Sequence, residues 1–456
     1  MEAAKVRKIV AKLRRHLNDG RFVLPISTQQ SASRKAVASS EPCWVSSVEL
    51  PLPEKQNVHQ CLFGVIEGLG EGHEKVDPVD AAVVGAEWVG HCQAPEALTV
   101  ASSGAGTYER LMKDTSSEVT LLYVHENPRL INDLLTFVIF SRGSPAASRS
   151  AIAKMAKLTG GRCLAVQYRV APQTPFPGAV LDLLVAYLSL LYPLPGALHA
   201  PVSPSSIVFT GESSGANLCL SLLQVLLELS RQQKTSTPTL NWNGQQVALP
   251  VPAGLAAICA WADLAQSLPS WTNNSDYDLM ESGQPRASQP GFPTCAAWPT
   301  DPPRGDIYCD LSCLCHPLVS PCVAKDWTGA PPLLFLCGEE RVADSNKIIA
   351  QRAFSQGCSV AWEQFESMPH IFLLALESLP HSHLAFERWA GFCKDCVGGG
   401  MRGSRGMVFE VESLEGRAVD VGGLTEIGVE EALGYMRGQQ SRRRIVTGCA
   451  RGKASL

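Results

Sequence analysis

The sequence predicts an α/β protein with a mostly parallel central sheet and helices on both faces. Short stretches rich in apolar and β-branched residues alternate with longer helical patterns along most of the chain, as in repeated strand–helix–strand units. Hydrophobic residues make up 45% of the 456 residues, which is enough to bury a sizeable core. The longest apolar runs, around 134–140 and 218–229, are broken or shorter than the roughly 20 residues of a membrane span, so none is expected.

The expected elements begin with a short basic amphipathic helix at 6–17, and regular alternation starts near residue 81. Stretches of apolar, β-branched and aromatic residues predict strands at 81–89, 118–125, 162–170, 205–211, 254–264, 331–338 and 360–366. Helical patterns are expected between or after these strands, at 147–158, 179–191, 216–231, around 348–357 and up to about 396. A glycine-rich linker then leads to a hairpin and a terminal helix, at 398–407, 408–421 and 425–444.

Three segments are expected from this order. Residues 1–80 form an N-terminal cap segment, 81–396 the main domain, and 397–456 a linker, hairpin and helix. The main domain contains an insertion at 266–332 that is rich in Pro, Asp, Ser and Gly. Because so long a connection in a compact domain is usually functional, we expect this insertion to be a lid. Its aromatic residues would line the pocket or anchor the lid to the core; they are Trp271, Tyr277, Phe292 and Trp298.

Composition narrows the classes of function. Lys and Arg number 39 against 43 Asp and Glu, and the net charge of −4 argues against binding to nucleic-acid phosphates. Residues 1–17 carry six basic side chains with no apolar stretch behind them. We therefore expect no secretory signal and a cytoplasmic location, with organelle targeting left open. The 16 cysteines are scattered, many of them in apolar runs, which favours buried free thiols in a reducing compartment.

Residues 211–215 read Gly-Glu-Ser-Ser-Gly and lie between an expected strand and an apolar helix. A nucleophilic serine must project from a tight turn, and a glycine on each side lets strand and helix approach without a Cβ clash. The N-terminal N–H groups of the helix point to where an oxyanion would form. We therefore predict Ser213 as the nucleophile and the Ser214 amide as an oxyanion-hole donor. An ordinary tight turn is the alternative interpretation.

A serine hydroxyl needs a base to take its proton. In this type of fold the base follows the nucleophile along the chain, which leaves His316, His370, His381 and His383. His370 comes in a loop after the expected strand at 360–366, where it could reach the carboxyl edge of the sheet, and it is the predicted base. His316 lies in the insertion, and His381 and His383 are expected to be solvated at the start of a helix.

The base in turn needs a carboxylate that fixes its tautomer. The loop after the expected strand at 331–338 offers Glu339, Glu340 and Asp344. Any of the three could also be an ordinary solvated carboxylate, so the pattern alone leaves the choice open.

Several motifs resemble the hormone-sensitive-lipase-like branch of the α/β hydrolases (alpha/beta hydrolase fold-3). Residues 166–191 are similar to its YRxAP…FPxAxxD signature, GESSGANL at 211–218 to its GDSAGGNL, and MPHIF at 368–372 to its GMPHGF. Residues 306–321 and 409–428 resemble the steryl-acetyl-hydrolase-like subgroup. The resemblance covers about residues 80–440 and implies the α/β-hydrolase fold with a serine esterase activity.

The resemblance also bears on the triad acid. The family's acid loop reads roughly DPLRD, and its first Asp, four residues before the second, is the triad acid. On residues 338–345, Asp344 matches the second position and Glu340 the first. The resemblance therefore implies Glu340 as the acid, with Asp344 and Glu339 as alternatives.

The chain departs from the family after His125. The family has an HGGG motif there, whose glycine amides donate to the oxyanion, but the stretch from Glu126 to Arg142 has neither the glycines nor the expected length. The family-like GSPAxxR pattern resumes at 143–149. An unspliced intron would produce such a stretch, and genuine divergence is the alternative. Loss of one oxyanion donor typically costs about 10²–10³ in rate, so this stretch bears directly on activity.

The leading hypothesis is a serine hydrolase that cleaves small hydrophobic carboxylic esters through an acyl-enzyme on Ser213. The alternative is an impaired hydrolase fold that binds small hydrophobic ligands, and an amidase would share the same triad. The natural ester and the oligomeric state stay open.

No cofactor or metal is expected. The cluster of Cys309, Cys313, Cys315 and His316 lacks the CxxC pairs of zinc sites, and the CxxC at 393–396 lies in a helix. The chain also lacks the GxxxxGK[ST] motif of a nucleotide-binding P-loop.

Overall fold

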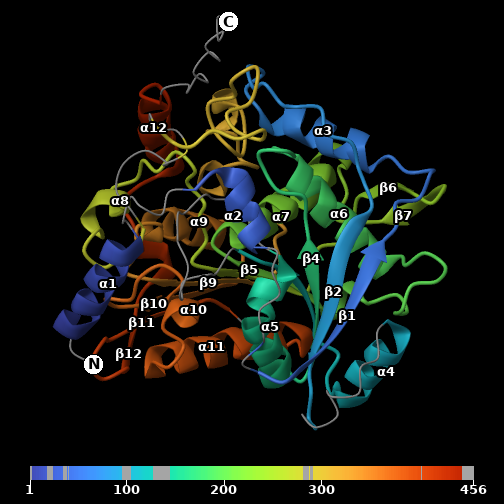
Figure 1. The fold of residues 1–456 in the computed structure, drawn as a ribbon, viewed down its shortest axis with the longest axis horizontal. Coiled ribbons are helices and arrows are strands. Elements are labelled where there is room, and N and C mark those ends of the chain that lie inside the picture. The colour runs from blue at the N-terminus through green and yellow to red at the C-terminus, as the bar shows by residue number, and fades with distance from the viewer. Residues whose placement is uncertain are drawn as a thin grey trace, which may run out of the picture.

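The computed structural model describes residues 3–17, 24–33, 39, 41–94, 104–126, 144–280, 287, 291–401 and 403–443. Within these residues ten strands form one sheet, in the order β1–β2–β4–β3–β5–β8–β9–β10–β11–β12 (Figure 1). Along the chain they are β1 (Cys43–Leu50), β2 (Val84–His91), β3 (Thr120–Val124), β4 (Arg162–Gln167), β5 (Ile207–Glu212), β8 (Gly254–Ile258), β9 (Leu333–Gly338), β10 (Val360–Phe365), β11 (Arg405–Phe409) and β12 (Gly416–Ala418).

The middle of the sheet is parallel. Neighbouring strands from β4 through β3, β5, β8, β9 and β10 to β11 all pair in parallel. Both margins of the sheet are antiparallel. At one margin β2 pairs antiparallel with β4 and with β1, and at the other β12 pairs antiparallel with β11. The carboxyl ends of the parallel strands therefore meet at one edge, beyond which ligand sites of open α/β sheets form.

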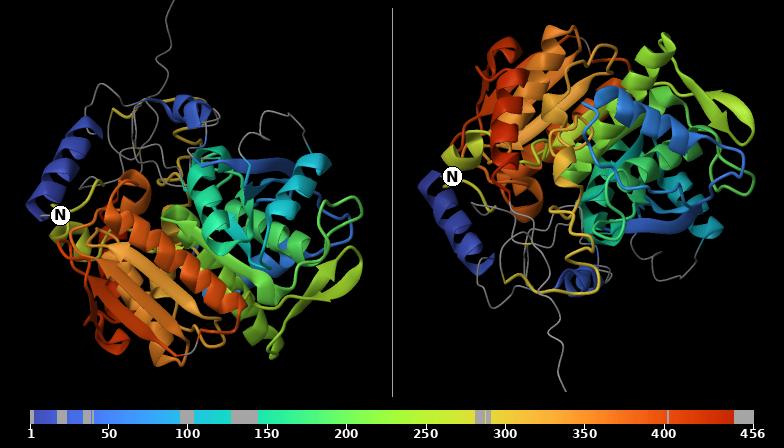
Figure 2. Two further views of the ribbon diagram at one scale, coloured as in Figure 1. Left: turned by 90° about the horizontal axis from the view of Figure 1, so that it is seen from below. Right: turned by 90° about the horizontal axis from the view of Figure 1, so that it is seen from above.

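Helices cover both faces of the sheet (Figures 1 and 2). One face carries α5 (Pro145–Thr159), the short α10 (Phe372–Ala375) and α11 (Pro380–Val397), and the other carries α6 (Gly178–Leu191), α7 (Ser214–Gln233) and α9 (Ala343–Ser355), with α3 (Val58–Leu69) packed on α6 and α7. Successive strand residues point to opposite faces. Leu121 and Val208 accordingly belong to one core, and Leu122 and Phe209 belong to the other.

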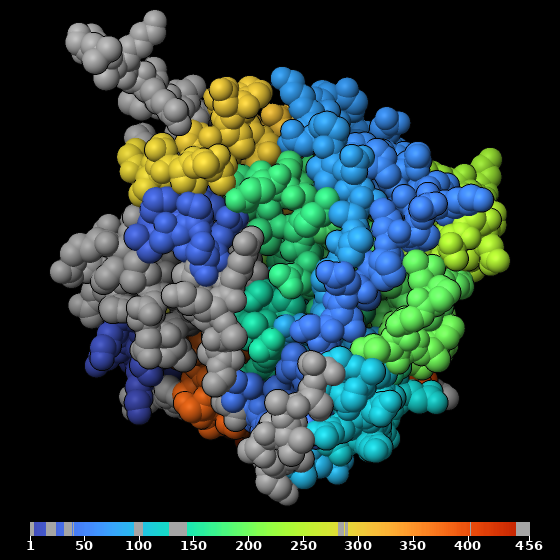
Figure 3. Space-filling view, turned by 45° about the vertical axis from the view of Figure 1, so that its right-hand side comes forward, coloured from blue at the N-terminus to red at the C-terminus, as the bar shows by residue number. Residues whose placement is uncertain are grey.

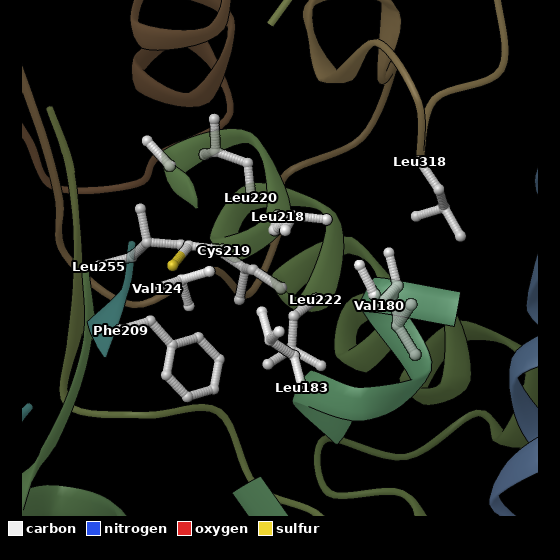
Figure 4. Close-up of a cluster of buried hydrophobic side chains, with 14 of the residues drawn as sticks. Val124, Val180, Leu183, Phe209, Leu218, Cys219, Leu220, Leu222, Leu255 and Leu318 are labelled. Carbon is white, nitrogen blue, oxygen red and sulfur yellow. The ribbon is translucent and has the colours of Figure 1, made fainter. Parts of the chain in front are cut away.

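Helix α7 runs through the second of these cores. Its residues from Ser214 to Leu227 are all buried, so the helix is enclosed on every side rather than amphipathic. Figure 4 shows Leu218 and Leu222 of this helix beside Leu183 of α6 and Phe209 of β5. This packing fixes the N-terminus of α7 at the end of β5, where the site lies. Among the described helices, none combines the length and the apolar character needed to cross a membrane.

The predicted fold class is confirmed, and the expected strands and helices from residue 81 onward are present with shifted ends. The expected strand at 254–264 ends at Ile258, and the expected linker at 398–407 overlaps the start of β11. The prediction missed elements that the structure places at the margins of the sheet or outside it. These are β1, α3, α4 (Ala105–Asp114) and the hairpin of β6 (Thr239–Trp242) and β7 (Gln245–Ala248). The terminal helix expected at 425–444 is present as the shorter α12 (Val429–Gln440).

Two N-terminal helices lie against the insertion at 266–332. In α1 (Ala3–Leu17), the Arg7 guanidinium lies 4.5 Å from the ring centre of Tyr277. In α2 (Ile26–Ser33), Ser27 interacts with the thiol of Cys295, and Figure 3 shows this helix beside the yellow part of the insertion. In the same N-terminal segment, β1 instead pairs with β2 and is part of the sheet.

Candidate active site

Ser213 lies in the sharp turn between β5 and α7. Its backbone has φ of 50°, in the left-handed region that a non-glycine residue rarely adopts. The surrounding main chain holds this conformation, since the Ser213 N–H donates to Ile258 O (2.9 Å) and the Ser213 carbonyl accepts from Trp261 N (3.1 Å). Backbone strain of this kind is typical of a nucleophile elbow and costs about 1–3 kcal/mol.

The two glycines that flank this turn are required by the end of β3. A Cβ added to Gly215 would lie 2.0 Å from the Val124 carbonyl oxygen, and one added to Gly211 would lie 2.4 Å from the same atom. Neither contact is possible for a real side chain. The glycines therefore let β3, β5 and α7 converge behind Ser213.

The structure brings His370 to Ser213. His370 follows β10 in a short loop, and its Nε2 is 2.8 Å from Ser213 Oγ, although 157 residues separate the two. The imidazole is fully buried, and the Trp261 ring is nearly perpendicular to it at a centroid distance of 6.0 Å. The neighbouring Ser213 and Trp261 side chains limit rotation of the imidazole.

Of the three candidate acids, Glu340 is the one that meets the imidazole. Its Oε2 is hydrogen-bonded to His370 Nδ1, and its Oε1 accepts from the Gly338 N–H (2.9 Å) at the end of β9. The carboxylate of Asp344 instead accepts from the Ser270 N–H (2.7 Å), and that of Glu339 accepts from the Ser367 N–H (2.9 Å).

Two further carboxylates, those of Glu126 and Asp278, act on His370, and the sequence alone predicts neither of them as part of the site. Burial alone would lower the pKa of His370, but the charge and hydrogen bond of Glu340, followed by the charges of Glu126 and Asp278, raise it to about 9. Asp278 is buried in the insertion and accepts from the backbone N–H groups of Arg341 (2.6 Å) and Met280 (3.0 Å). No local sequence pattern marks Asp278, because only the folding of the insertion brings it to His370.

A thiol also borders Glu340 and His370. Cys259 Sγ lies within 4.8 Å of ligand atoms of Glu340 and His370, which is compact enough to hold a metal ion. However, burial raises the pKa of Cys259 well above its usual value, so the thiol stays protonated and is a poor ligand. Glu340 and His370 are moreover hydrogen-bonded to each other. These residues fit a triad acid and base better than a metal centre.

The expected oxyanion side begins at the end of β3. His125 is buried and stacks on Tyr168 at 4.7 Å, and burial lowers its pKa to about 4, so it is neutral. Glu126 stands where the family has its first glycine, and it is 6% exposed. Residues 127–142 of the departing stretch lie outside the described residues. On the opposite side, Ser214 begins α7 and presents the N-terminus of a 20-residue helix to the site.

The other histidines after Ser213 are engaged elsewhere. His316 is buried, and its Nε2 is 3.0 Å from the Ile66 carbonyl oxygen. The expectation that His381 is solvated is wrong: it is buried, with Nε2 2.9 Å from Val411 O, because α11 packs that turn against the segment after β11. His383 is exposed, as expected.

Known proteins of similar sequence are named as hydrolases. An acetyl-hydrolase of Streptomyces hygroscopicus is 28% identical over 285 residues, which are 62% of this chain and 78% of the relative. An esterase of Acinetobacter venetianus is 26% identical over 257 residues, which are 56% of this chain and 71% of the relative.

Solved structures share the fold. EstE5, in a crystal soaked with p-nitrophenyl butyrate, superposes with a TM-score of 0.56 at 21% identity, over 86% of this chain and 98% of EstE5. A hormone-sensitive lipase from a metagenome library gives 0.54 at 19% identity, over 87% of this chain and 99% of that one. Residues 138–374 match the family described as alpha/beta hydrolase fold, which confirms the resemblance found in the motifs. Because this match spans more than half of the sequence, the chain belongs to the alpha/beta hydrolase fold family.

Proposed function

We propose that this chain is a serine hydrolase that cleaves carboxylic esters with an apolar part through an acyl-enzyme on Ser213. The observation that carries the proposal is the hydrogen-bonded series of Ser213, His370 and Glu340 at the ends of β5, β10 and β9. The names of the relatives, an acetyl-hydrolase and an esterase, support an ester substrate and make acetyl esters the first class to test.

In the proposed reaction Ser213 Oγ attacks the ester carbonyl carbon while His370 Nε2 accepts the hydroxyl proton. Glu340 holds the other imidazole proton on Nδ1, which keeps Nε2 free and stabilises the imidazolium that forms. The imidazolium then protonates the departing alkoxide as the C–O bond breaks. A water molecule, deprotonated by His370, finally hydrolyses the acyl-enzyme and returns Ser213 to its starting state.

The Ser214 amide is the proposed donor to the oxyanion on the helix side. It is the first residue of α7, so the positive end of the helix dipole adds to its hydrogen bond. By analogy with the family, the Ser214 amide is the one oxyanion donor that the described residues supply. The family's other donors correspond to the stretch after His125.

We also propose that α1, α2 and the insertion form a cap that selects the ester. Contacts between aromatic rings support this role. The centre of the Trp271 ring, in the insertion, lies 5.4 Å from that of the Trp261 ring, and Trp261 in turn borders His370. Trp271 and Trp298 are buried, which favours anchoring of the cap, whereas the ring of Tyr277 meets Arg7 of α1.

Labelling with a fluorophosphonate probe tests the nucleophile. The wild type should label covalently, Ser213→Ala should not, and Ser230→Ala should label normally because Ser230 lies far along the same helix. Hydrolysis of p-nitrophenyl acetate and butyrate, compared with a p-nitroanilide, then separates an esterase from an amidase. A folded wild type that binds a hydrophobic ligand but never labels would overturn the proposal in favour of a binding protein.

A further inference from the structure

Glu126 occupies a fixed position at the active-site end of β3. Its carbonyl oxygen lies 3.2 Å from His125 Nδ1, and its backbone N–H is hydrogen-bonded to the buried carboxyl of Glu212. Glu212 in turn is hydrogen-bonded to the hydroxyl of Tyr123. The main chain of Glu126 is therefore held from two sides, which directs its side chain.

The carboxylate of Glu126 lies on the nucleophile side of the imidazole. Its Oε2 is 3.8 Å from His370 Nε2, the same nitrogen that is 2.8 Å from Ser213 Oγ. This oxygen is buried and has no hydrogen-bond partner among the described residues, whereas the carboxyl group as a whole is hydrogen-bonded to the Ser213 side chain. A buried carboxylate oxygen without a donor is costly, and a proton on the adjacent imidazole lowers that cost.

Other charged groups around the imidazole reinforce the same effect. Glu340 lies at Nδ1, after β9, and Asp278 approaches from the insertion. Arg341 acts electrostatically on Asp278, and the Cys259 thiol after β8 borders Glu340. On the Glu126 side, the neighbouring titratable groups are Tyr168, after β4, and Glu212 of β5. Among the carboxylates that the structure describes, Glu126 is thus the closest to the nitrogen that must accept the serine proton.

We propose that ionised Glu126 restrains the reaction by holding His370 in its imidazolium form, so that Ser213 lacks a free base at neutral pH. The inference rests on the proposed Ser213–His370–Glu340 triad. An imidazolium has no lone pair at Nε2, so His370 cannot accept the serine proton in this form.

The pH range of this effect follows from the two groups. Burial raises the pKa of Glu126 to about 7, while burial of His370 is outweighed by its three carboxylates, which raise its pKa to about 9. Between roughly these values the pair exists as carboxylate and imidazolium. His370 is a free base only at a pH above its raised pKa, so activity should rise only at alkaline pH. Removal of the Glu126 charge lowers that pKa and extends activity toward neutral pH.

The test compares Glu126→Gln, which removes the charge and keeps the shape, with Glu366→Gln. Glu366 is a matched control four residues before His370, with a half-exposed side chain paired to Arg417. The measured quantities are the rate of fluorophosphonate labelling and kcat/KM for p-nitrophenyl acetate, from about pH 6 to pH 10. We expect the acid limb of E126Q to move down by about one pH unit or more, with about tenfold faster labelling at pH 7, and that of E366Q to stay in place.

Glu126→Gly provides a second variant and should move the limb in the same direction. Titration of His370, followed by imidazole ¹⁵N resonances, should show the same shift without any substrate. If E126Q and E126G label through Ser213 with the wild-type pH profile, the restraint by Glu126 is wrong and the triad stands. If no variant labels at any pH although all are folded, the proposed function is wrong and this inference falls with it.

Discussion

Asp344 and Ser270 exchange two hydrogen bonds that tie the start of α9 to the insertion. The Ser270 N–H donates to Asp344 Oδ2 (2.7 Å), and the Asp344 N–H donates to Ser270 Oγ (3.1 Å). Asp344 is thus occupied by the insertion, whereas Glu340, four residues earlier, is bonded to His370. These two carboxylates, four residues apart, have different hydrogen-bond partners, and substitution can separate their contributions.

Glu340→Gln should lower kcat/KM by about 10³–10⁴-fold, because the amide cannot hold the Nδ1 proton and stabilise the imidazolium. Asp344→Asn should keep activity close to that of the wild type, since Asn retains an oxygen that accepts from Ser270. Ester hydrolysis by both purified variants checks this, with circular dichroism as the control for folding. A damaging D344N together with a mild E340Q would show that the acid has been assigned four residues too early.

Gly215→Ala should destabilise the protein and slow the reaction together. The added Cβ would lie 2.0 Å from the Val124 carbonyl oxygen, and the strand end must shift to accommodate it. We expect a loss of about 1–3 kcal/mol in the free energy of unfolding. Gly64→Ala in α3 is the matched control, since nothing lies within 4 Å of its Cβ, and a helical Gly→Ala change gains about 0.5–1 kcal/mol. Urea unfolding of both variants measures the difference, and equal midpoints would contradict the close approach.

The parts of the fold that the sequence predicted are those with a local pattern. β9 is a continuous apolar run, β5 and β10 are mostly apolar, and nearly all residues of the three strands are buried. α6 and α7 are long, mostly apolar helices, so each of these elements is recognisable without its partners. The order of these elements was enough to place Ser213, His370 and the loop of Glu340 at strand ends on one edge. Their roles as nucleophile, base and acid remain predictions.

What the sequence did not predict depends on contacts between distant segments. β1 is defined by its eight-residue pairing with β2, and its burial alternates only in part. The sequence alone predicts a cap segment over residues 1–80, which includes this strand. Asp278 faces His370 only because the insertion folds back over the sheet. The missing glycines distinguish the stretch after His125 in the sequence, but the position of the Glu126 carboxylate beside His370 follows from the way β3 ends, which no local pattern contains.

Deletion of residues 1–33 should change substrate preference more than stability. It removes α1 and α2, which contact the insertion through Arg7 and Ser27, and it leaves β1 in the sheet. We expect the ratio of kcat/KM for p-nitrophenyl butyrate to that for acetate to change, or activity to be lost, while the core unfolds at a similar temperature. Deletion of residues 1–60 is the contrasting variant, because it also removes β1 and the start of α3, and it should destabilise the fold. Unchanged kinetics after the shorter deletion would refute a cap role for the two helices.

Replacement of residues 126–142 by a short glycine-rich turn of the family's HGGG type should raise both solubility and turnover. Within this stretch LLTFVIF, at 134–140, has six apolar residues and one Thr, with no charge and no Pro. Such a segment is an aggregation hazard when exposed, and a piece of the lid when packed over the active-site mouth. The new turn would supply two backbone donors beside the Ser214 amide, so the gain in turnover should be on the order of 10³ or more. Glu126→Gly alone is the control, because it removes the carboxylate beside His370 and adds no such loop. Equal solubility and equal rates before and after the replacement would show that the stretch is a native element and that the oxyanion is stabilised by other groups.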